Sequence, residues 1–142
     1  AILRDAKVLV VEDNEINLYI AVELLQHTGA EVSTAKNGQE AVEKFAASPE
    51  GYYDLILMDV QMPVMDGYRA TNTIRQLSRK DAGSVIIIAM TANSFYEDIR
   101  KCMDSGMNAH IAKPFVMEDV ISTYTDVLTA EGKEGYDSTK NE

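Results

Sequence analysis

Short apolar runs alternate with helical patterns five times along this chain of 142 residues. The runs at residues 8–11, 55–58 and 85–90 contain no polar residue, which is typical of strands covered on both faces of a sheet. A more polar strand is predicted at 31–35, and a short fifth strand at 109–112. Strands that alternate with helices favour a parallel sheet with right-handed crossovers and a helical layer on each face.

Five helices are expected between and after these strands, each with apolar residues spaced three or four apart. The expected inward positions are Leu18, Ala21, Val22 and Leu25 in the first helix, Ala41, Val42 and Phe45 in the second, Ala70, Ile74 and Leu77 in the third, Phe95, Ile99 and Cys102 in the fourth, and Val120, Tyr124, Val127 and Leu128 in the fifth. Asn37 and Asp66 are candidate N-caps of the second and third helices, and Ser94 with Glu97 forms a candidate capping box for the fourth. Five strand–helix units are too few to close an eight-stranded barrel. The predicted fold is therefore α/β, with a single open, doubly wound, five-stranded parallel sheet.

Composition and charge exclude several classes of function. The formal net charge is −10, which argues against nucleic-acid binding by this domain, because phosphate backbones are bound by clusters of Lys and Arg. The longest apolar run is too short to cross a bilayer, so no membrane contact is expected from this domain. A single cysteine, Cys102, cannot form an internal disulfide and fits a reducing compartment. We therefore expect a cytoplasmic domain, whether or not a longer parent protein is anchored in a membrane.

The two ends of the sequence indicate a piece of a longer protein. The chain begins without a methionine, and it ends in the polar stretch EGKEGYDSTKNE. A segment of this composition buries too little apolar surface to stay folded. We predict one folded domain over residues 6–130 and a disordered tail or linker over 131–142.

Polar and charged residues stand at the carboxyl ends of the predicted strands. Glu12 and Asp13 follow the first strand, Asp59 the third, Thr91 the fourth and Lys113 the fifth. In open doubly wound sheets, ligands bind beyond these ends, at the point where the strand order reverses. Three carboxylates, a hydroxyl and an ammonium group are therefore expected to meet in one crevice.

The three carboxylates predict a magnesium site next to a phosphoacceptor. Crowded carboxylates repel one another and resist ionisation unless a cation is present, and hard oxygen ligands suit Mg²⁺. A bound Mg²⁺ leaves coordination positions for phosphate oxygens, while Lys113 and Thr91 can contact a phosphoryl group. Asp59 leads into a loop and is therefore free to act as a nucleophile towards phosphorus. The residues themselves thus favour a phosphoryl group carried on Asp59.

Four segments of the chain resemble the receiver domains of two-component response regulators and hybrid histidine kinases. They are VLVVEDNEIN, DLILMDVQMPVMDGYRA, IIIAMTAN and GMNAHIAKPF, in the order and spacing that this family has. The resemblance spans about residues 6–130, and the phrases MDVQMPVMDG and SGMNAHIAKP are most similar to the receiver of a hybrid histidine kinase. It implies a flavodoxin-like sheet with strand order 2-1-3-4-5.

The resemblance also implies roles for the residues at matching positions. Asp59 would accept a phosphoryl group from a phosphohistidine, with Thr91 and Lys113 contacting the phosphoryl oxygens. The ligands of Mg²⁺ would be Asp13, Asp59, Glu12 (directly or through water) and the backbone carbonyl of Gln61. Catalysis would then come mainly from positioning and charge stabilisation.

Other matching positions concern switching and the lifetime of the phosphoaspartate. Gln61 and Asn93 match positions that tune its hydrolysis, and the peptide bond before Pro114 would be cis. Phosphorylation would draw Thr91 inward and change the face formed by the fourth helix, the fifth strand and the fifth helix. His110 occupies the position of the family's switch aromatic, often Tyr or Phe, and a hydrogen-bonded strand residue is its alternative interpretation.

The implied partner is a histidine kinase or a histidine phosphotransfer domain, because neither histidine of this chain stands in a phosphotransfer context. A homodimer formed on phosphorylation is compatible with the resemblance. The isolated domain would not be an enzyme beyond its own phosphorylation and dephosphorylation, whereas a parent chain could be a histidine kinase.

Two other interpretations belong to different classes of protein. A pseudo-receiver would be an interaction module that keeps the fold without phosphorylation, but every phosphorylation residue is present here. A haloacid-dehalogenase-type phosphatase also uses a strand-end aspartate with Mg²⁺, but it needs a second carboxylate two residues further on, where this chain has Gln61.

Overall fold

The structure, a computed structural model, describes residues 2–92 and 95–131. The strands are β1 (Lys7–Val11), β2 (Glu31–Ala35), β3 (Leu55–Asp59), β4 (Ile86–Thr91) and β5 (Ala109–Ala112). The helices are α1 (Glu15–Gln26), α2 (Gly38–Ala47), α3 (Gly67–Arg75), the short 3₁₀ helix η1 (Lys80–Ala82), α4 (Tyr96–Ser105) and α5 (Met117–Ala130). Within the described ranges, no helix combines the length and hydropathy needed to span a membrane.

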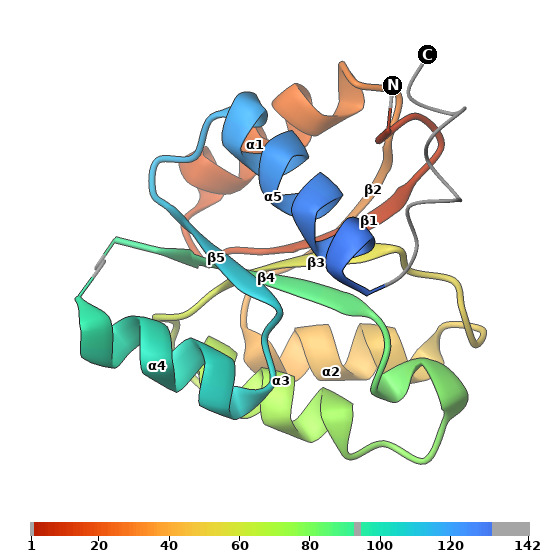
Figure 1. Cartoon of the computed structure of the whole chain (residues 1–142), viewed down its shortest axis with the longest axis vertical. Coiled ribbons are helices and arrows are strands. Elements are labelled where there is room, and N and C mark those ends of the chain that lie inside the picture. Colours follow the sequence, from red (N-terminus) through yellow and green to blue (C-terminus); the bar gives the residue numbers. More distant parts are fainter. Residues whose placement is uncertain (1, 93–94, 132–142) are drawn as a thin grey trace.

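The five strands form one parallel sheet in the order β2-β1-β3-β4-β5, which confirms the predicted fold class and strand order. Helices α1 and α5 cover one face of the sheet, and α2, α3 and α4 cover the other (Figure 1). The central strands β3 and β4 are buried along their whole length because they lie between these two layers. The edge strand β2 is more exposed, which explains its more polar sequence.

The strand register brings the predicted site residues to one edge of the sheet. It pairs Val11 with Met58, Asp59 with Met90, and Thr91 with Ala112. Because parallel strands that end in step present their carboxyl ends together, Glu12, Asp59 and Lys113 emerge at the same edge. The sheet topology therefore brings these residues to one edge independently of any contact between their side chains.

Two of the predicted helix caps are confirmed. The side chain of Asn37 accepts a hydrogen bond from the backbone N–H of Glu40 at 2.9 Å, and Asp66 accepts one from Arg69 at 2.9 Å. These bonds satisfy backbone donors that the first turn of a helix leaves unpaired. The short polar side chains thus fix where α2 and α3 begin.

The start of α4 differs from the prediction. The helix begins at Tyr96, and Phe95 occupies the N-cap position without a side-chain capping bond. Phe95 is 72% exposed, so its predicted inward orientation is wrong, because it precedes the helix instead of joining the stripe that buries Cys102. Ser94, the predicted cap, lies outside the described residues.

The packed core begins before the predicted domain boundary at residue 6. Ile2 and Leu3 are 5% and 0% exposed and pack with Leu25 of α1 in the cluster beneath α1 and α5. At the other end, α5 buries the predicted positions Val120, Tyr124, Val127 and Leu128. Glu131 ends this helix, and the predicted tail beyond it lies outside the described residues.

Arg79 joins the carboxyl end of α2 to the segment before β4. Its guanidinium donates hydrogen bonds to the backbone carbonyls of Phe45 and Ser48 at 2.7 and 2.9 Å, and lies 4.5 Å from the centre of the Phe45 ring. It also binds both carboxylate oxygens of Asp81, at 2.6 and 3.0 Å. Asp81 in turn accepts the backbone N–H of Gly51. The Arg79 guanidinium lowers the pKa of the Asp81 carboxyl, because the ion pair favours its charged form.

This ion pair predicts a pH-dependent contribution to stability. Because the folded pKa of Asp81 is lowered, the contribution is present above the unfolded pKa of about 4 and is lost as the pH falls through the lower folded value. We expect Asp81→Asn to lower the free energy of unfolding by about 1–2 kcal/mol at pH 7, and by less at pH 3. Urea denaturation at the two pH values measures this difference.

Glu31→Gln provides the control, because it removes the more exposed Lys7–Glu31 ion pair. Its effect should be smaller at pH 7, since solvent screens exposed pairs. An equal loss of stability at pH 3 and pH 7 for Asp81→Asn would contradict the ionic origin of the contribution.

Candidate functional site

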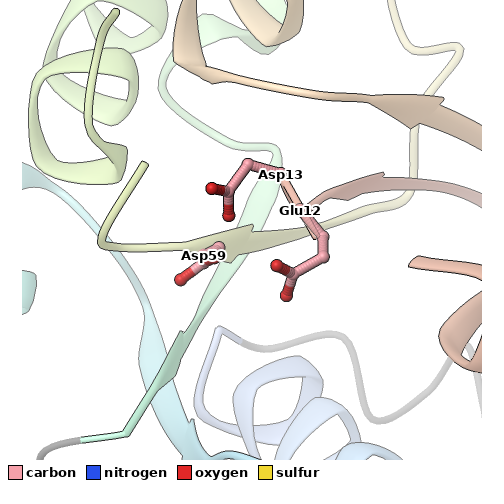
Figure 2. Close-up of side chains that lie close together, drawn as sticks. All are labelled: Glu12, Asp13 and Asp59. Atoms are coloured by element: carbon pink, nitrogen blue, oxygen red, sulfur yellow. The ribbon is translucent and has the colours of Figure 1, made fainter. Parts of the chain in front are cut away.

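Three carboxylates meet at the carboxyl edge of the sheet. Glu12 and Asp13 follow β1, Asp59 ends β3, and each contributes a carboxylate oxygen within 4.8 Å of the others. Figure 2 shows the three side chains around a common space. Glu12 and Asp59 are each 3% exposed, whereas Asp13 is exposed. The cluster is therefore buried on one side and open to solvent on the other.

Lys113 supplies the positive charge of the site. It follows β5, and its Nζ lies 3.1 Å from Glu12 Oε1 and 3.2 Å from Asp59 Oδ2. Its backbone N–H donates to the carbonyl of Thr91 at 2.9 Å, which holds the lysine beside the end of β4. One ammonium against three carboxylates leaves a formal charge of −2, which a divalent cation can neutralise.

Backbone N–H groups orient the two buried carboxylates. The second oxygen of Glu12 accepts a hydrogen bond from the N–H of Asn14 at 3.1 Å, and the second oxygen of Asp59 accepts one from Gln61 at 3.3 Å. Each of these carboxylates is thus held by Lys113 on one oxygen and by the backbone on the other. Their oxygens cannot rotate away from the shared space without losing these bonds.

The electrostatics of the cluster shift two pKa values. Burial and the neighbouring Glu12 charge raise the pKa of Asp59 to about 6, against the opposing effect of Lys113 and of the Gln61 N–H. Burial acts to lower the pKa of Lys113, but its contacts with Glu12 and Asp59 outweigh burial, and the pKa is raised. Lys113 therefore stays an ammonium, while Asp59 gains from any further positive charge brought beside it.

Two other predicted residues lie next to the cluster. Thr91 ends β4 and is 2% exposed. The peptide bond between Lys113 and Pro114 is cis, as predicted. The structure therefore brings three carboxylates within 4.8 Å of one another and Lys113 into contact with two of them, with Thr91 at the end of a neighbouring strand.

The remaining predicted residues lie further from the cluster or are not described. His110 lies inside β5, three residues before Lys113, is half-buried, and pairs with Ala89 of β4. Gln61 is exposed, near the start of the loop after β3, and its backbone N–H donates to Asp59 Oδ1. Asn93 lies outside the described residues.

Residues 8–125 match the sequence profile of the response regulator receiver domain. The chain belongs to this family. The match covers both the acidic cluster and Lys113, so the residues that meet at the sheet edge lie within a receiver domain of two-component signalling.

Relatives of this receiver domain include parts of much longer kinases. The chain is 44% identical over 124 residues to the hybrid signal transduction histidine kinase B of Dictyostelium discoideum, with 81% of this chain and 6% of that protein covered. The chain therefore spans a small part of the length of the curated relatives that it matches.

Two solved structures resemble this receiver domain closely. The receiver domain of the sensor histidine kinase PA1611 from Pseudomonas aeruginosa has a TM-score of 0.76 and 35% identity, covering 87% of this chain and 98% of that one, and carries a magnesium ion in its active site cleft. The receiver domain of Ssk1, in a co-crystal with the histidine phosphotransfer protein Ypd1 of Saccharomyces cerevisiae, has a TM-score of 0.76 and 34% identity, covering 89% and 90%.

Helix α1 has an exposed apolar face that the sequence pattern did not predict. Ile16, Tyr19 and Ile20 are 71%, 67% and 49% exposed, and their spacing of three and four places them on one side of the helix. A hollow of about 70 Å³ joins Ile20 to Glu12, Lys113 and Phe115. The sequence does contain a signal for this face. Apolar residues surround most of the circumference of α1, whereas a helix that packs against a sheet needs only one apolar stripe.

The raised pKa of Asp59 predicts a stability difference between the wild-type receiver domain and Asp59→Asn without Mg²⁺. Because the folded pKa lies above the unfolded value, the stability that the protonated carboxyl contributes is complete below about pH 4 and is lost as the pH rises through about 6. We expect Asp59→Asn to be more stable by about 2–3 kcal/mol at pH 7, with the difference becoming small near pH 4. Thermal or urea unfolding in EDTA across this range measures it. A pH-independent difference would contradict the shift.

Proposed function

We propose that this receiver domain accepts a phosphoryl group on Asp59 from a phosphohistidine, in a reaction that requires Mg²⁺. The proposal depends on one observation above all. A carboxylate at the tip of a buried strand lies within reach of two other carboxylates and 3.2 Å from the ammonium of Lys113. This arrangement suits the transfer of a highly charged group, for which positioning and electrostatics matter most.

The residues present fit a magnesium ion. The donors are carboxylate oxygens from Glu12, Asp13 and Asp59, which are the hard ligands that Mg²⁺ prefers, and their formal charge exceeds that of Lys113 by two. The exposure of Asp13 leaves that side open for water or phosphate oxygens. The magnesium in the cleft of the PA1611 receiver domain supports this assignment. The backbone carbonyl of Gln61 is the proposed fourth protein ligand, because Gln61 starts the loop beside the cluster.

The chain's own residues would act on the transferred group as follows. A carboxylate oxygen of Asp59 forms the new bond to phosphorus, while the bond between phosphorus and the donor's imidazole nitrogen breaks and the imidazole regains a proton. Lys113, which now contacts Asp59 Oδ2, would hold a phosphoryl oxygen with the same ammonium group. The Thr91 hydroxyl would contact another phosphoryl oxygen from the end of β4. When bound, Mg²⁺ would neutralise the carboxylates and stabilise charge on the transferred group.

The proposed donor is a histidine phosphotransfer domain or the histidine of a kinase. Ssk1, a structural neighbour, is bound to such a phosphotransfer protein in its co-crystal. The exposed apolar face of α1, formed by Ile16, Tyr19 and Ile20, would form the centre of the docking surface, because it borders the hollow that leads to Glu12 and Lys113. The parent protein is proposed to be a hybrid histidine kinase, in line with the Dictyostelium relative.

The output of phosphorylation stays a prediction. Thr91, buried at the end of β4, would move towards the phosphoryl group, and the face of α4, β5 and α5 would change with it. Half-buried His110 on β5 lies in that face, as the predicted switch residue. A homodimer formed on phosphorylation is compatible with this proposal.

Acetyl phosphate tests the phosphoacceptor directly. We expect one phosphoryl adduct per wild-type chain in the presence of Mg²⁺, none in EDTA and none in Asp59→Asn, because the carboxylate is the nucleophile. Intact mass measures the adduct, and hydroxylamine should remove it. Asp126→Asn, which changes an exposed carboxylate on α5, is the matched control and should be phosphorylated normally. An adduct that persists in Asp59→Asn would contradict the assignment.

The docking surface is tested with phosphorylated Ypd1 as the donor. We expect Tyr19→Ala to slow transfer to Asp59 by about tenfold, because exposed aromatic residues at the centre of an interface often contribute this much binding energy. Tyr96→Ala on α4 is the matched control, since Tyr96 is 75% exposed against 67% for Tyr19. Radiolabelled transfer assays measure both rates. Phosphorylation by acetyl phosphate should be unchanged in both variants, and equal slowing by both would argue against α1 as the docking surface.

A further inference from the structure

The loop between β3 and α3, residues 60–66, connects the phosphoacceptor to the start of α3. At its beginning, the backbone N–H of Val60 donates to the carbonyl of Met90 in β4 at 3.3 Å. At its far end, the N–H of Gly67 donates back to the carbonyl of Val60 at 3.1 Å. Gln61 follows Val60 directly and gives its N–H to Asp59. These hydrogen bonds fix both ends of the loop. The position of the loop therefore determines where the backbone carbonyl of Gln61 lies.

The loop contains a strained turn. Val64 has a φ of +70°, and the N–H of Met65 donates to the carbonyl of Pro63 at 2.7 Å, which closes a three-residue turn of the rare γ type. A β-branched residue in this conformation is an outlier that persists only where the surroundings impose it. The Val64 side chain is 77% exposed, so burial of that side chain does not impose it. Other contacts must hold the loop in this shape.

Gly38, the first residue of α2, makes such a contact. Its backbone N–H donates to the carbonyl of Met65 at 3.0 Å, directly after the strained residue. A Cβ at Gly38 would lie 2.5 Å from the carbonyl oxygen of Met65 and 2.9 Å from that of Asp66. Both obstacles are backbone atoms, which cannot rotate away as a flexible side chain can. Only glycine allows the start of α2 to pack against the loop at this distance.

The loop also has a fixed support on its other side. A Cβ at Gly67 would overlap the carbonyl oxygen of Asp59 itself, so the start of α3 is packed directly against the end of β3. Helices α2 and α3 lie side by side on this face of the sheet (Figure 1). The loop is thus confined between the starts of two helices, and both contacts depend on the absence of a side chain.

We propose that Gly38 is a positioning residue for the metal site. By letting α2 hold the loop at Met65, it keeps the strained turn closed and the Gln61 carbonyl in place beside Asp59. This inference rests on the proposed function, since it requires Gln61 to be a ligand of Mg²⁺. A side chain at Gly38 would push the loop outward and weaken Mg²⁺ binding, although residue 38 itself touches no metal ligand.

The test measures Mg²⁺ affinity of the folded domain by titration calorimetry. We expect Gly38→Ala to weaken binding by about tenfold or more, as changes behind metal ligands commonly do. Gly83→Ala is the matched control, because a Cβ at Gly83 has no atom within 4 Å, and its affinity should equal that of the wild type. Adding Val64→Gly to Gly38→Ala should restore part of the affinity, since glycine lets the displaced turn adopt another shape. A merely destabilised domain would not regain Mg²⁺ affinity in this way.

The wild-type titration separates this inference from the proposed function. If the wild type does not bind Mg²⁺, the proposed function fails and the role of Gly38 fails with it. If the wild type binds and folded Gly38→Ala binds equally well, the role of Gly38 is overturned while the proposed function stands.

Should Gly38→Ala not fold, NMR of the wild type decides. The amide signals of Gly38 and Gln61 should then shift with one Mg²⁺ saturation curve while that of Gly83 stays fixed, and an unmoved Gly38 signal would overturn the inference.

Discussion

The site depends on the cost of keeping negative charge at the end of a buried strand. Asp59 and Glu12 are almost fully buried, and keeping a carboxylate charge away from water costs free energy. Lys113 offsets part of this cost by contacting both, and backbone N–H groups bind the remaining oxygens. The net charge of the cluster stays negative, and burial together with the Glu12 charge raises the pKa of Asp59. A cation therefore meets a site that is already arranged and that lacks positive charge.

The parallel sheet provides the rigid frame for this arrangement. The site residues come from β1, β3, β4 and β5, and they are brought together by register and not by a single loop. Contacts that stabilise the fold, such as the Arg79–Asp81 pair, connect other segments and contain no residue of the acidic cluster. Two apolar layers and polar contacts outside the site stabilise the domain. This stability offsets the unfavourable electrostatics of the acidic cluster.

Much of this could be predicted from the sequence because its signals are local. Uninterrupted apolar runs mark β3 and β4, and Asn37 and Asp66 mark helix starts through a single hydrogen bond each. The site followed from strand-end positions combined with a general rule for parallel sheets. The apolar spacing wrongly includes Phe95 in the inward stripe of α4, because periodicity does not show where a helix begins. The exposed face of α1 and the close approach of Gly38 to Met65 depend on distances between elements, which no local pattern contains.

The uneven burial of the three carboxylates affects how fast a metal ion can enter and leave the site. Glu12 and Asp59 are enclosed, but Asp13 stands in contact with bulk water, so a cation could enter and leave without any part of the fold opening. Because Mg²⁺ gives up its bound water reluctantly, exchange at such a site would be limited by the loss of water from the ion and not by a protein motion. Arrival of the metal would then not be the slow step of the response. The pace would be set by the encounter with a protein donor and by the survival of the acyl phosphate.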